Sequence, residues 1–220
     1  ELSLRELAES QGIDIGTAIC IRRQRVDAEY VSVLKREFGM IVGENAFKWE
    51  AIHPLRTRYY FDDTDEIVAL AEANGMELRG HTLVWHNQNP SWLARRIETR
   101  DEAIAVLKDH IQTVVGRYKG KIAAWDVVNE AVDDSTGELR ESPWLTAIGP
   151  DYIALAFEFA HEADPDAKLY YNDYGAEGVG GKGDAVYELV KGLKEQGVPI
   201  DGVGWQGQFQ SNSFIMDLRS

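Results

Sequence analysis

The chain has 220 residues, 44% of them hydrophobic and 27% charged, and its formal net charge is −14 at pH 7. This length and composition predict one globular domain over residues 1–220, because no linker or low-complexity stretch divides the chain. The negative charge argues against nucleic acid as a partner, and no apolar run approaches the roughly 20 residues of a membrane span.

Segments with strand-like and helix-like patterns alternate along the chain, after a short lead-in helix over 2–10. Strands are predicted at 15–21, 40–45, 76–84, 122–128, 168–172 and 203–205, and helices at 27–38, 62–74, 101–118, 150–163 and 183–195, with the start of another at 213–220. Gly75 suits a left-handed cap after the second of these helices, and Pro150 is predicted at the first position of the fourth.

Polar and aromatic side chains gather where the predicted strands end. They are Glu44, Asn45 and Lys48 after the second strand, His81, Trp85, His86 and Gln88 around the end of the third, Asn129 and Glu130 after the fourth, Asn172, Asp173 and Tyr174 after the fifth, and Gln206 and Gln208 after the sixth. Alternating strands and helices form parallel sheets, and functional groups at successive strand ends are typical of a (β/α)₈ TIM barrel rather than a doubly wound sheet. We therefore predict a TIM barrel, truncated in this chain to about six strands.

The segment from Trp125 to Glu130 ends a predicted strand with an amide and a carboxylic acid side by side. A retaining glycosidase needs this pair at one sugar, the acid to protonate the leaving oxygen and the amide to bind a hydroxyl. A lone Glu after a strand is more often a helix cap or a surface charge, so the surrounding motifs decide the interpretation. Because strict alternation would send Asn129 and Glu130 to opposite faces, we predict a bulge or the strand end there.

Five segments resemble glycoside hydrolase family 10, the endo-β-1,4-xylanases, and they occur in the family's order. They are ENAFKWE at 44–50, RGHTLVWH at 79–86 with PSW at 90–92, WDVVNE at 125–130, YNDY at 171–174 and GVGWQ at 202–206. Any one of them could arise by chance, whereas all five in order are specific. The resemblance implies an eight-fold barrel with a cleft across its carboxyl face, and hydrolysis of internal xylan linkages with retention and without a cofactor.

The resemblance also implies roles for individual residues. Glu130 is expected to be the general acid/base, and Asn129 to bind the 2-hydroxyl of the sugar at the cleavage point. Glu44, Asn45, Lys48 and Gln88 are expected to hold the next glycone sugar, His81 and Trp85 the sugar at the cleavage point, and Gln206 also to bind substrate. Tyr174 is expected either on the leaving-group side or packed in the structure, and Asp126, His86 and Gln208 to support the residues that touch the sugar.

Other tryptophans are interpreted as structural, and the histidines are not interpreted as metal ligands. Trp49, Trp92 and Trp125 are assigned to the core or the cleft wall rather than to direct sugar contact. His81 and His86 do not indicate a metal site, because no third ligand follows at a suitable spacing and no His-Glu-x-x-His motif occurs.

The chain departs from the family pattern in two places. Gln208 stands where the family usually has a His that supports the nucleophile, and an amide cannot carry a proton. The nucleophile itself, a Glu in a Thr-Glu-Leu-Asp-like motif on the seventh strand, is absent from this chain. The other carboxylates available are Glu44, Asp133 and Asp173, and we expect none of them to replace the nucleophile.

Six parallel strands cannot close as eight do, so open sheet edges are expected. We therefore expect a fragment, or a barrel that a complementary C-terminal fragment or second chain completes, and the absence of an initial Met suggests a trimmed product. The leading functional hypothesis is a secreted xylanase acting on xylan or xylo-oligosaccharides, the location being implied by the resemblance alone. The alternatives are a non-catalytic xylan-binding fragment or half of a split enzyme, and a retaining β-1,4-glucanase.

Overall fold

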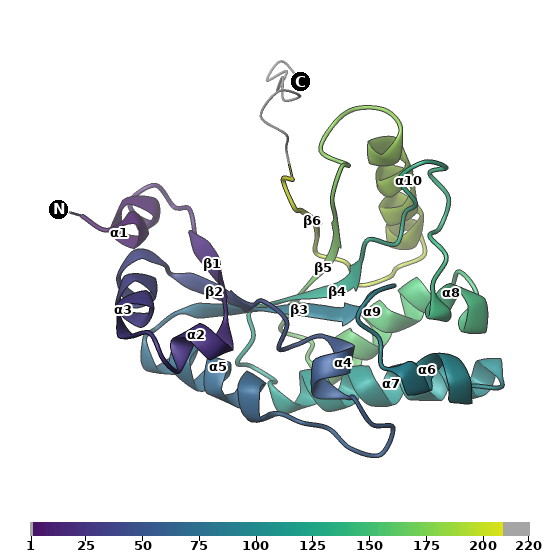
Figure 1. Cartoon of the computed structure of the whole chain (residues 1–220). Coiled ribbons are helices and arrows are strands. Elements are labelled where there is room, and N and C mark those ends of the chain that lie inside the picture. The colour runs from purple at the N-terminus through teal and green to yellow at the C-terminus, as the bar shows by residue number, and fades with distance from the viewer. Residues whose placement is uncertain (1, 209–220) are drawn as a thin grey trace.

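The computed structural model describes residues 2–208, apart from the side chains of 94–96. Its strands are β1 (Gly16–Ile19), β2 (Met40–Gly43), β3 (Glu77–Val84), β4 (Ala124–Asn129), β5 (Lys168–Asp173) and β6 (Gly202–Trp205). They form one 6-stranded sheet in chain order, and every neighbouring pair is parallel (Figure 1). This half-barrel confirms the predicted class, a truncated (β/α)₈ barrel.

Helices connect the strands and cover the sheet. They are α1 (Leu4–Glu9), α2 (Ile21–Gln24), α3 (Ala28–Glu37), α4 (Trp49–Ile52), α5 (Asp62–Ala73), α6 (Ser91–Arg96), α7 (Arg100–Arg117), α8 (Pro143–Ile148), α9 (Tyr152–Ala163) and α10 (Lys182–Glu195). Figure 1 shows α5, α7 and α9 running along one face of the sheet. Each crossover returns the chain to the same end, so the carboxyl ends of the strands meet at one rim.

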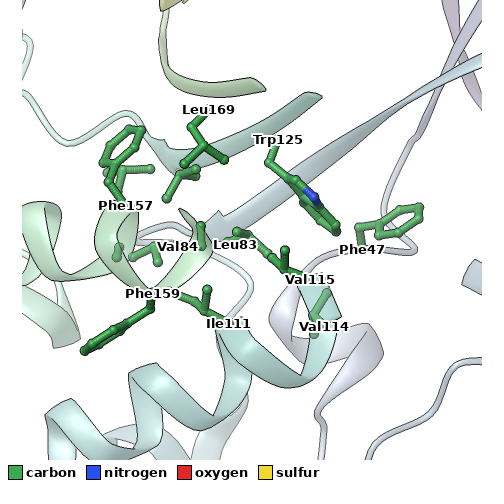
Figure 2. Close-up of a cluster of buried hydrophobic side chains, with 14 of the residues drawn as sticks. Phe47, Leu83, Val84, Ile111, Val114, Val115, Trp125, Phe157, Phe159 and Leu169 are labelled. Atoms are coloured by element: carbon green, nitrogen blue, oxygen red, sulfur yellow. The ribbon is translucent and has the colours of Figure 1, made fainter. Parts of the chain in front are cut away.

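The core lies between the sheet and this helical layer. Figure 2 shows Trp125 projecting from β4 toward Phe47, and their rings meet edge to face at 5.9 Å between centroids. All six positions of β4 are buried, as expected for a parallel strand that is covered on both faces. Trp49, Trp92 and Trp125 are 2%, 8% and 0% exposed, which confirms that they belong to the core.

Several predicted boundaries were wrong by a few residues. The first strand ends at Ile19 rather than at residue 21, because α2 begins at Ile21. Cys20, between β1 and α2, is partly exposed. The predicted helix at 150–163 begins at Tyr152, and the proline at the start of a helix is Pro143 of α8 instead of Pro150. Short helices in the loops were missed because their patterns span too few residues to show a period.

The helix predicted at 213–220 lies outside the described residues. Within the described part of the chain, β1 pairs only with β2 and β6 only with β5, so each end of the sheet has an open edge. No helix described here is long and apolar enough to cross a membrane.

Candidate active site

Glu130 follows the last residue of β4 and adopts a left-handed backbone conformation with φ of 55°. Its carboxyl group accepts two hydrogen bonds, from Trp85 Nε1 to Oε2 at 2.7 Å and from Gln206 Nε2 to Oε1 at 2.8 Å. The residue is 8% exposed. The predicted strand end is confirmed, and the turn directly after it places this carboxyl between side chains that follow β3 and β6.

Asn129 lies beside Glu130 and shares one of its partners. Its Oδ1 accepts hydrogen bonds from Asn172 Nδ2 at 2.7 Å and from Gln206 Nε2 at 3.3 Å. The amide nitrogen of Gln206 therefore contacts both residues of the Asn-Glu pair. The pairing of β4 with β5 also shifts register between Asp126 and Val128, earlier in the strand than the position where the sequence predicted a bulge or strand end.

Asp126 of β4 anchors His81 and Arg79 of the neighbouring strand β3. Its carboxylate contacts His81 Nδ1 at 2.9 Å and Arg79 Nε at 3.1 Å. Burial acts to raise the pKa of Asp126, but the hydrogen bonds from His81 and Arg79 outweigh it, and the pKa is lowered. The ionised carboxylate fixes the orientation of the His81 ring. The supporting role of Asp126 in the reaction stays a prediction.

Lys48, Asn45 and Gln88 form a polar group beside Trp85. Asn45 Oδ1 accepts from Lys48 Nζ at 2.9 Å and from Gln88 Nε2 at 3.2 Å. The Lys48 ammonium also lies 5.0 Å from the centroid of the Trp85 ring, and burial lowers its pKa. Glu44, in the loop that leads to this group, is exposed.

Glu50 is a member of this group that the sequence reasoning did not single out. Its carboxylate accepts from Gln88 Nε2 at 3.1 Å, and its backbone N–H donates to the Gln88 carbonyl at 3.0 Å. Gln88 has a positive φ of 48°, so these two bonds hold an uncommon conformation. The ENAFKWE motif contains Glu50, but no pattern separated it from an ordinary surface carboxylate.

His86 lies close to Glu130 without bonding to it. The distance from His86 Nδ1 to Glu130 Oε2 is 4.0 Å, too long for a hydrogen bond. Burial, helped by the charge of Arg140, lowers the pKa of His86, so the ring is neutral near pH 7. His86 therefore adjoins the Glu130 carboxyl as an uncharged ring.

Tyr174 makes its polar contacts within the structure. Its Oη donates to Asp134 Oδ2 at 2.6 Å, and Lys182 Nζ lies 3.8 Å from its ring centroid. Arg140 completes the group with a bond from Nη2 to Asp134 Oδ1 at 2.9 Å. The sequence reasoning missed Arg140, Asp134 and Lys182, because they lie outside the motifs and only the fold brings them to Tyr174.

Gln208 orients Gln206. Its Nε2 donates to Gln206 Oε1 at 2.8 Å, so the opposite end of the Gln206 amide, Nε2, faces Glu130. The predicted supporting residue thus contacts a predicted substrate-binding residue, which in turn contacts the predicted acid.

The three carboxylates considered as replacements for the nucleophile have other surroundings. Asp173 is 0% exposed and pairs with Lys182 Nζ at 2.8 Å. Asp133 accepts from the hydroxyl and N–H of Ser135, and these bonds lower its pKa. Glu44 follows β2, two strands away from Glu130 in the sheet. Among the described residues, no group of three or more His, Cys, Asp or Glu side chains is placed to hold a metal ion.

The Glu130 carboxyl lies at the carboxyl-end rim of the strands, where TIM-barrel enzymes carry their active sites, and glycoside hydrolases use Asp or Glu carboxyl groups as their catalysts. The model of glycosyl hydrolase family 10 matches residues 3–219, and the chain belongs to that family. Endo-1,4-beta-xylanase B of Thermotoga neapolitana is 48% identical over 94% of this chain and 60% of its own length. The beta-1,4-xylanase of Dictyoglomus thermophilum is 53% identical over 82% of this chain and 51% of its own.

Solved structures agree with this assignment. Native xylanase 10B of Thermotoga maritima superposes with a TM-score of 0.90 at 51% identity, covering 93% of this chain and 64% of that one. Xylanase 10B of Thermotoga petrophila RKU-1, solved with xylobiose, gives a TM-score of 0.91 at 50% identity over 94% and 63%. The chain therefore spans between 51% and 64% of the length of these relatives.

Proposed function

We propose that this chain forms part of the catalytic barrel of a retaining endo-β-1,4-xylanase and that Glu130 is its general acid/base. The observation that carries the proposal is the Glu130 carboxyl at the strand-end rim, bonded by Trp85 at 2.7 Å and Gln206 at 2.8 Å. The xylanase relatives support the substrate, because one of them is solved with xylobiose bound.

In this mechanism Glu130 protonates the leaving oxygen and later takes a proton from the attacking water. Asn129 hydrogen-bonds the 2-hydroxyl of the sugar at the cleavage point, a contact that strengthens as positive charge develops on the anomeric carbon. A second carboxylate must attack that carbon from about 5–5.5 Å away from the first. We assign this nucleophile to a seventh barrel strand, which is not among the described residues.

The polar group of Lys48, Asn45 and Gln88, with Glu44, is proposed to bind the glycone sugars. Its side chains already hold one another in place, so little conformational entropy remains to be lost when a sugar binds. The ring of Trp85 and the ring of His81, which Asp126 orients, are proposed to contact the sugar at the cleavage point. Tyr174 is proposed to lie at the leaving-group side, with its hydroxyl held by Asp134.

The open edges of β1 and β6 support a further part of the proposal. In a closed barrel these edges pair with the remaining strands, so we propose that a complementary C-terminal segment or chain completes the sheet. The experiment is a chimaera, called the completed barrel below, in which the C-terminal part of the Thermotoga maritima xylanase 10B barrel follows Gln208.

The completed barrel should hydrolyse xylan, and Glu130→Ala should abolish that cleavage. Glu162→Ala is the matched control, because this carboxylate of α9 is exposed and bonds to Lys108 and Gln112 of α7, away from Glu130. Cleavage retained in Glu130→Ala would overturn the acid/base assignment. Xylan binding without cleavage by the unaltered completed barrel would favour the alternative of a non-catalytic binding module.

One relative supports a second candidate function. A protein named exoglucanase XynX, of Acetivibrio thermocellus, is 44% identical over 94% of this chain. A retaining β-1,4-glucanase would use the same acid and differ in the sugars that it prefers. Initial rates of the completed barrel on xylan and on a soluble β-1,4-glucan separate the two functions, and faster glucan cleavage would reject the xylanase.

We also propose that the protein acts outside the cell, because polymeric xylan does not enter cells. A relative from Thermoanaerobacterium saccharolyticum is described as an intracellular xylanase, so the family itself does not decide the location. Fractionation of source cells, with an antibody against this chain, tests the proposal. Recovery from the cytoplasm alone would refute it.

A further inference from the structure

The left-handed backbone at Glu130 is held by its neighbours. A residue with a Cβ adopts this conformation at a cost, and it persists where the surroundings over-determine it. The Glu130 N–H donates to the Asn172 carbonyl at 2.8 Å, and Arg140 Nε donates to the Glu130 carbonyl at 3.1 Å. The next N–H, that of Ala131, donates to the hydroxyl of Tyr171 at 3.0 Å.

Tyr171 is the first residue of a buried chain of polar contacts. Its hydroxyl donates to Asp173 Oδ2 at 2.6 Å, and the other oxygen of Asp173 pairs with Lys182 Nζ at 2.8 Å. Tyr171 and Asp173 are both 0% exposed, and the Lys182 side chain is 6% exposed. The contacts run from the first residue of α10, through the end of β5, to the turn after β4.

The charge on Lys182 determines which group donates in each of these polar contacts. A carboxylate that is paired with an ammonium group only accepts hydrogen bonds, so the Tyr171 proton must point at Asp173. The lone pairs of the hydroxyl are then free for the Ala131 N–H, which supplies the bond seen at 3.0 Å. Without the ionised carboxylate, the Tyr171 hydroxyl could rotate and lose that bond.

Asp173 also affects the side chain of Glu130. Its backbone carbonyl accepts from the Gln206 N–H at 2.9 Å, and the Gln206 amide bonds to Glu130 Oε1 at 2.8 Å. Asp173, at the end of β5, is therefore connected through hydrogen bonds to both the backbone and the carboxyl group of Glu130.

We propose that Lys182, Asp173 and Tyr171 are positioning residues for the general acid of this enzyme. They hold the turn after β4 so that the Glu130 carboxyl meets the glycosidic oxygen, and they touch no substrate themselves. This inference rests on the proposed function, because it gives Glu130 the role of acid. A misplaced acid slows only those substrates whose leaving groups need a proton.

The test is Tyr171→Phe in the completed barrel, which removes the hydroxyl and keeps the buried ring. On xylo-oligosaccharides kcat/KM should fall by about tenfold, since general acid catalysis contributes about 10²–10⁴-fold and the acid is displaced, not removed. On 2,4-dinitrophenyl xylobioside, whose leaving group departs without a proton, the change should stay under about twofold. Asp173→Asn is the second variant and should show the same discrimination if Tyr171→Phe does not fold.

Tyr118→Phe is the matched control. Tyr118 is also buried, at 2% exposed, and its hydroxyl donates to Asp65 Oδ1 at 2.8 Å, away from Glu130. In Tyr118→Phe the ratio of kcat/KM on xylo-oligosaccharides to kcat/KM on 2,4-dinitrophenyl xylobioside should equal that of the unaltered protein. An equal loss of both rates in the folded positioning variant would show a structural role only, and unchanged rates would show no role; either result overturns the inference.

Glu130→Gln separates failure of this inference from failure of the proposed function. If Glu130→Gln does not discriminate between the two substrates, Glu130 is not the acid and the proposed function fails. If Glu130→Gln discriminates and Tyr171→Phe does not, only the positioning role fails.

Discussion

The close approach of the Trp125 ring to Gly80 predicts the effect of adding a single methyl group at residue 80. Gly80 of β3 pairs with Trp125 of β4, and a Cβ at residue 80 would lie 2.1, 2.3 and 2.6 Å from three atoms of the Trp125 ring. Ordinary contacts of this kind are 3.4 Å or longer, so the ring would have to move by more than 1 Å. Trp125 is 0% exposed and packs edge to face against Phe47, so it has no free space to enter.

Gly80→Ala should therefore destabilise the protein by about 3 kcal/mol, the upper end of the usual cost of overpacking a core. The assay is urea unfolding of the completed barrel, followed by tryptophan fluorescence, with the free energy extrapolated to water. Gly116→Ala is the matched control, because Gly116 lies in α7 and a Cβ there meets nothing within 4 Å. That variant should gain about 0.5–1 kcal/mol, since Ala loses less entropy in a helix.

The two substitutions add the same methyl group and should change stability in opposite directions. If the free energy of unfolding of Gly80→Ala stayed within about 0.5 kcal/mol of the unaltered protein, the range typical of neutral surface changes, the packing argument would be refuted.

The remaining predictions concern the site and its surroundings. Trp85→Phe keeps an aromatic face but removes the hydrogen bond to Glu130, so kcat/KM on xylan should fall by about tenfold, the equivalent of one net hydrogen bond. Steady-state kinetics of the completed barrel measures this change, and an unchanged kcat/KM contradicts the prediction. Lys48→Met should raise KM for xylobiosides more than it lowers kcat if Lys48 binds the glycone in the ground state, and an effect on kcat alone would reject that role. Burial lowers the pKa of His110 well below its ordinary value, so the folded protein keeps this ring neutral. Below a pH of about 6.5 the unfolded chain binds a proton at His110 that the folded protein does not bind. The free energy of unfolding should therefore fall there by at most about 1.4 kcal/mol per pH unit because of this group. Urea titrations at pH 7.5 and 5.5 should show that His110→Phe reduces this dependence, and an equal slope in both proteins would exclude His110 as its source.

Sequence patterns predicted the order and type of the long elements because each long strand and helix carries its own period. The helix over 101–118 shows this well, since Leu107, Ile111 and Val114 follow a helical stripe and are all 0% exposed in α7. The short helices α2, α4, α6 and α8 span only 4 to 6 residues each, too few for a period to be visible.

The candidate site was predicted where motifs mark it and missed where they do not. Asn129 and Glu130 stand out because an amide and an acid follow a buried strand. Lys182 gave no signal, because it is one lysine at the start of a helix, 52 positions after Glu130 in the chain. Its partner Asp173 ends β5 and its partner Asp134 lies in the segment after β4. No local pattern in the sequence links the lysine to either carboxylate.

By itself the sequence determined that strands and helices alternate and that polar groups follow the strand ends, because both depend on residues that are neighbours along the chain. Only the tertiary structure decided which of these groups touch. Parallel crossovers bring the ends of β3, β4, β5 and β6 to one rim. There the Glu130 carboxyl is bonded by Trp85 and Gln206, and the turn that carries it is held by the series of polar contacts between Lys182 and Tyr171. Hydrogen bonds depend on distance in space, and the register of the sheet, not the order of residues, sets that distance.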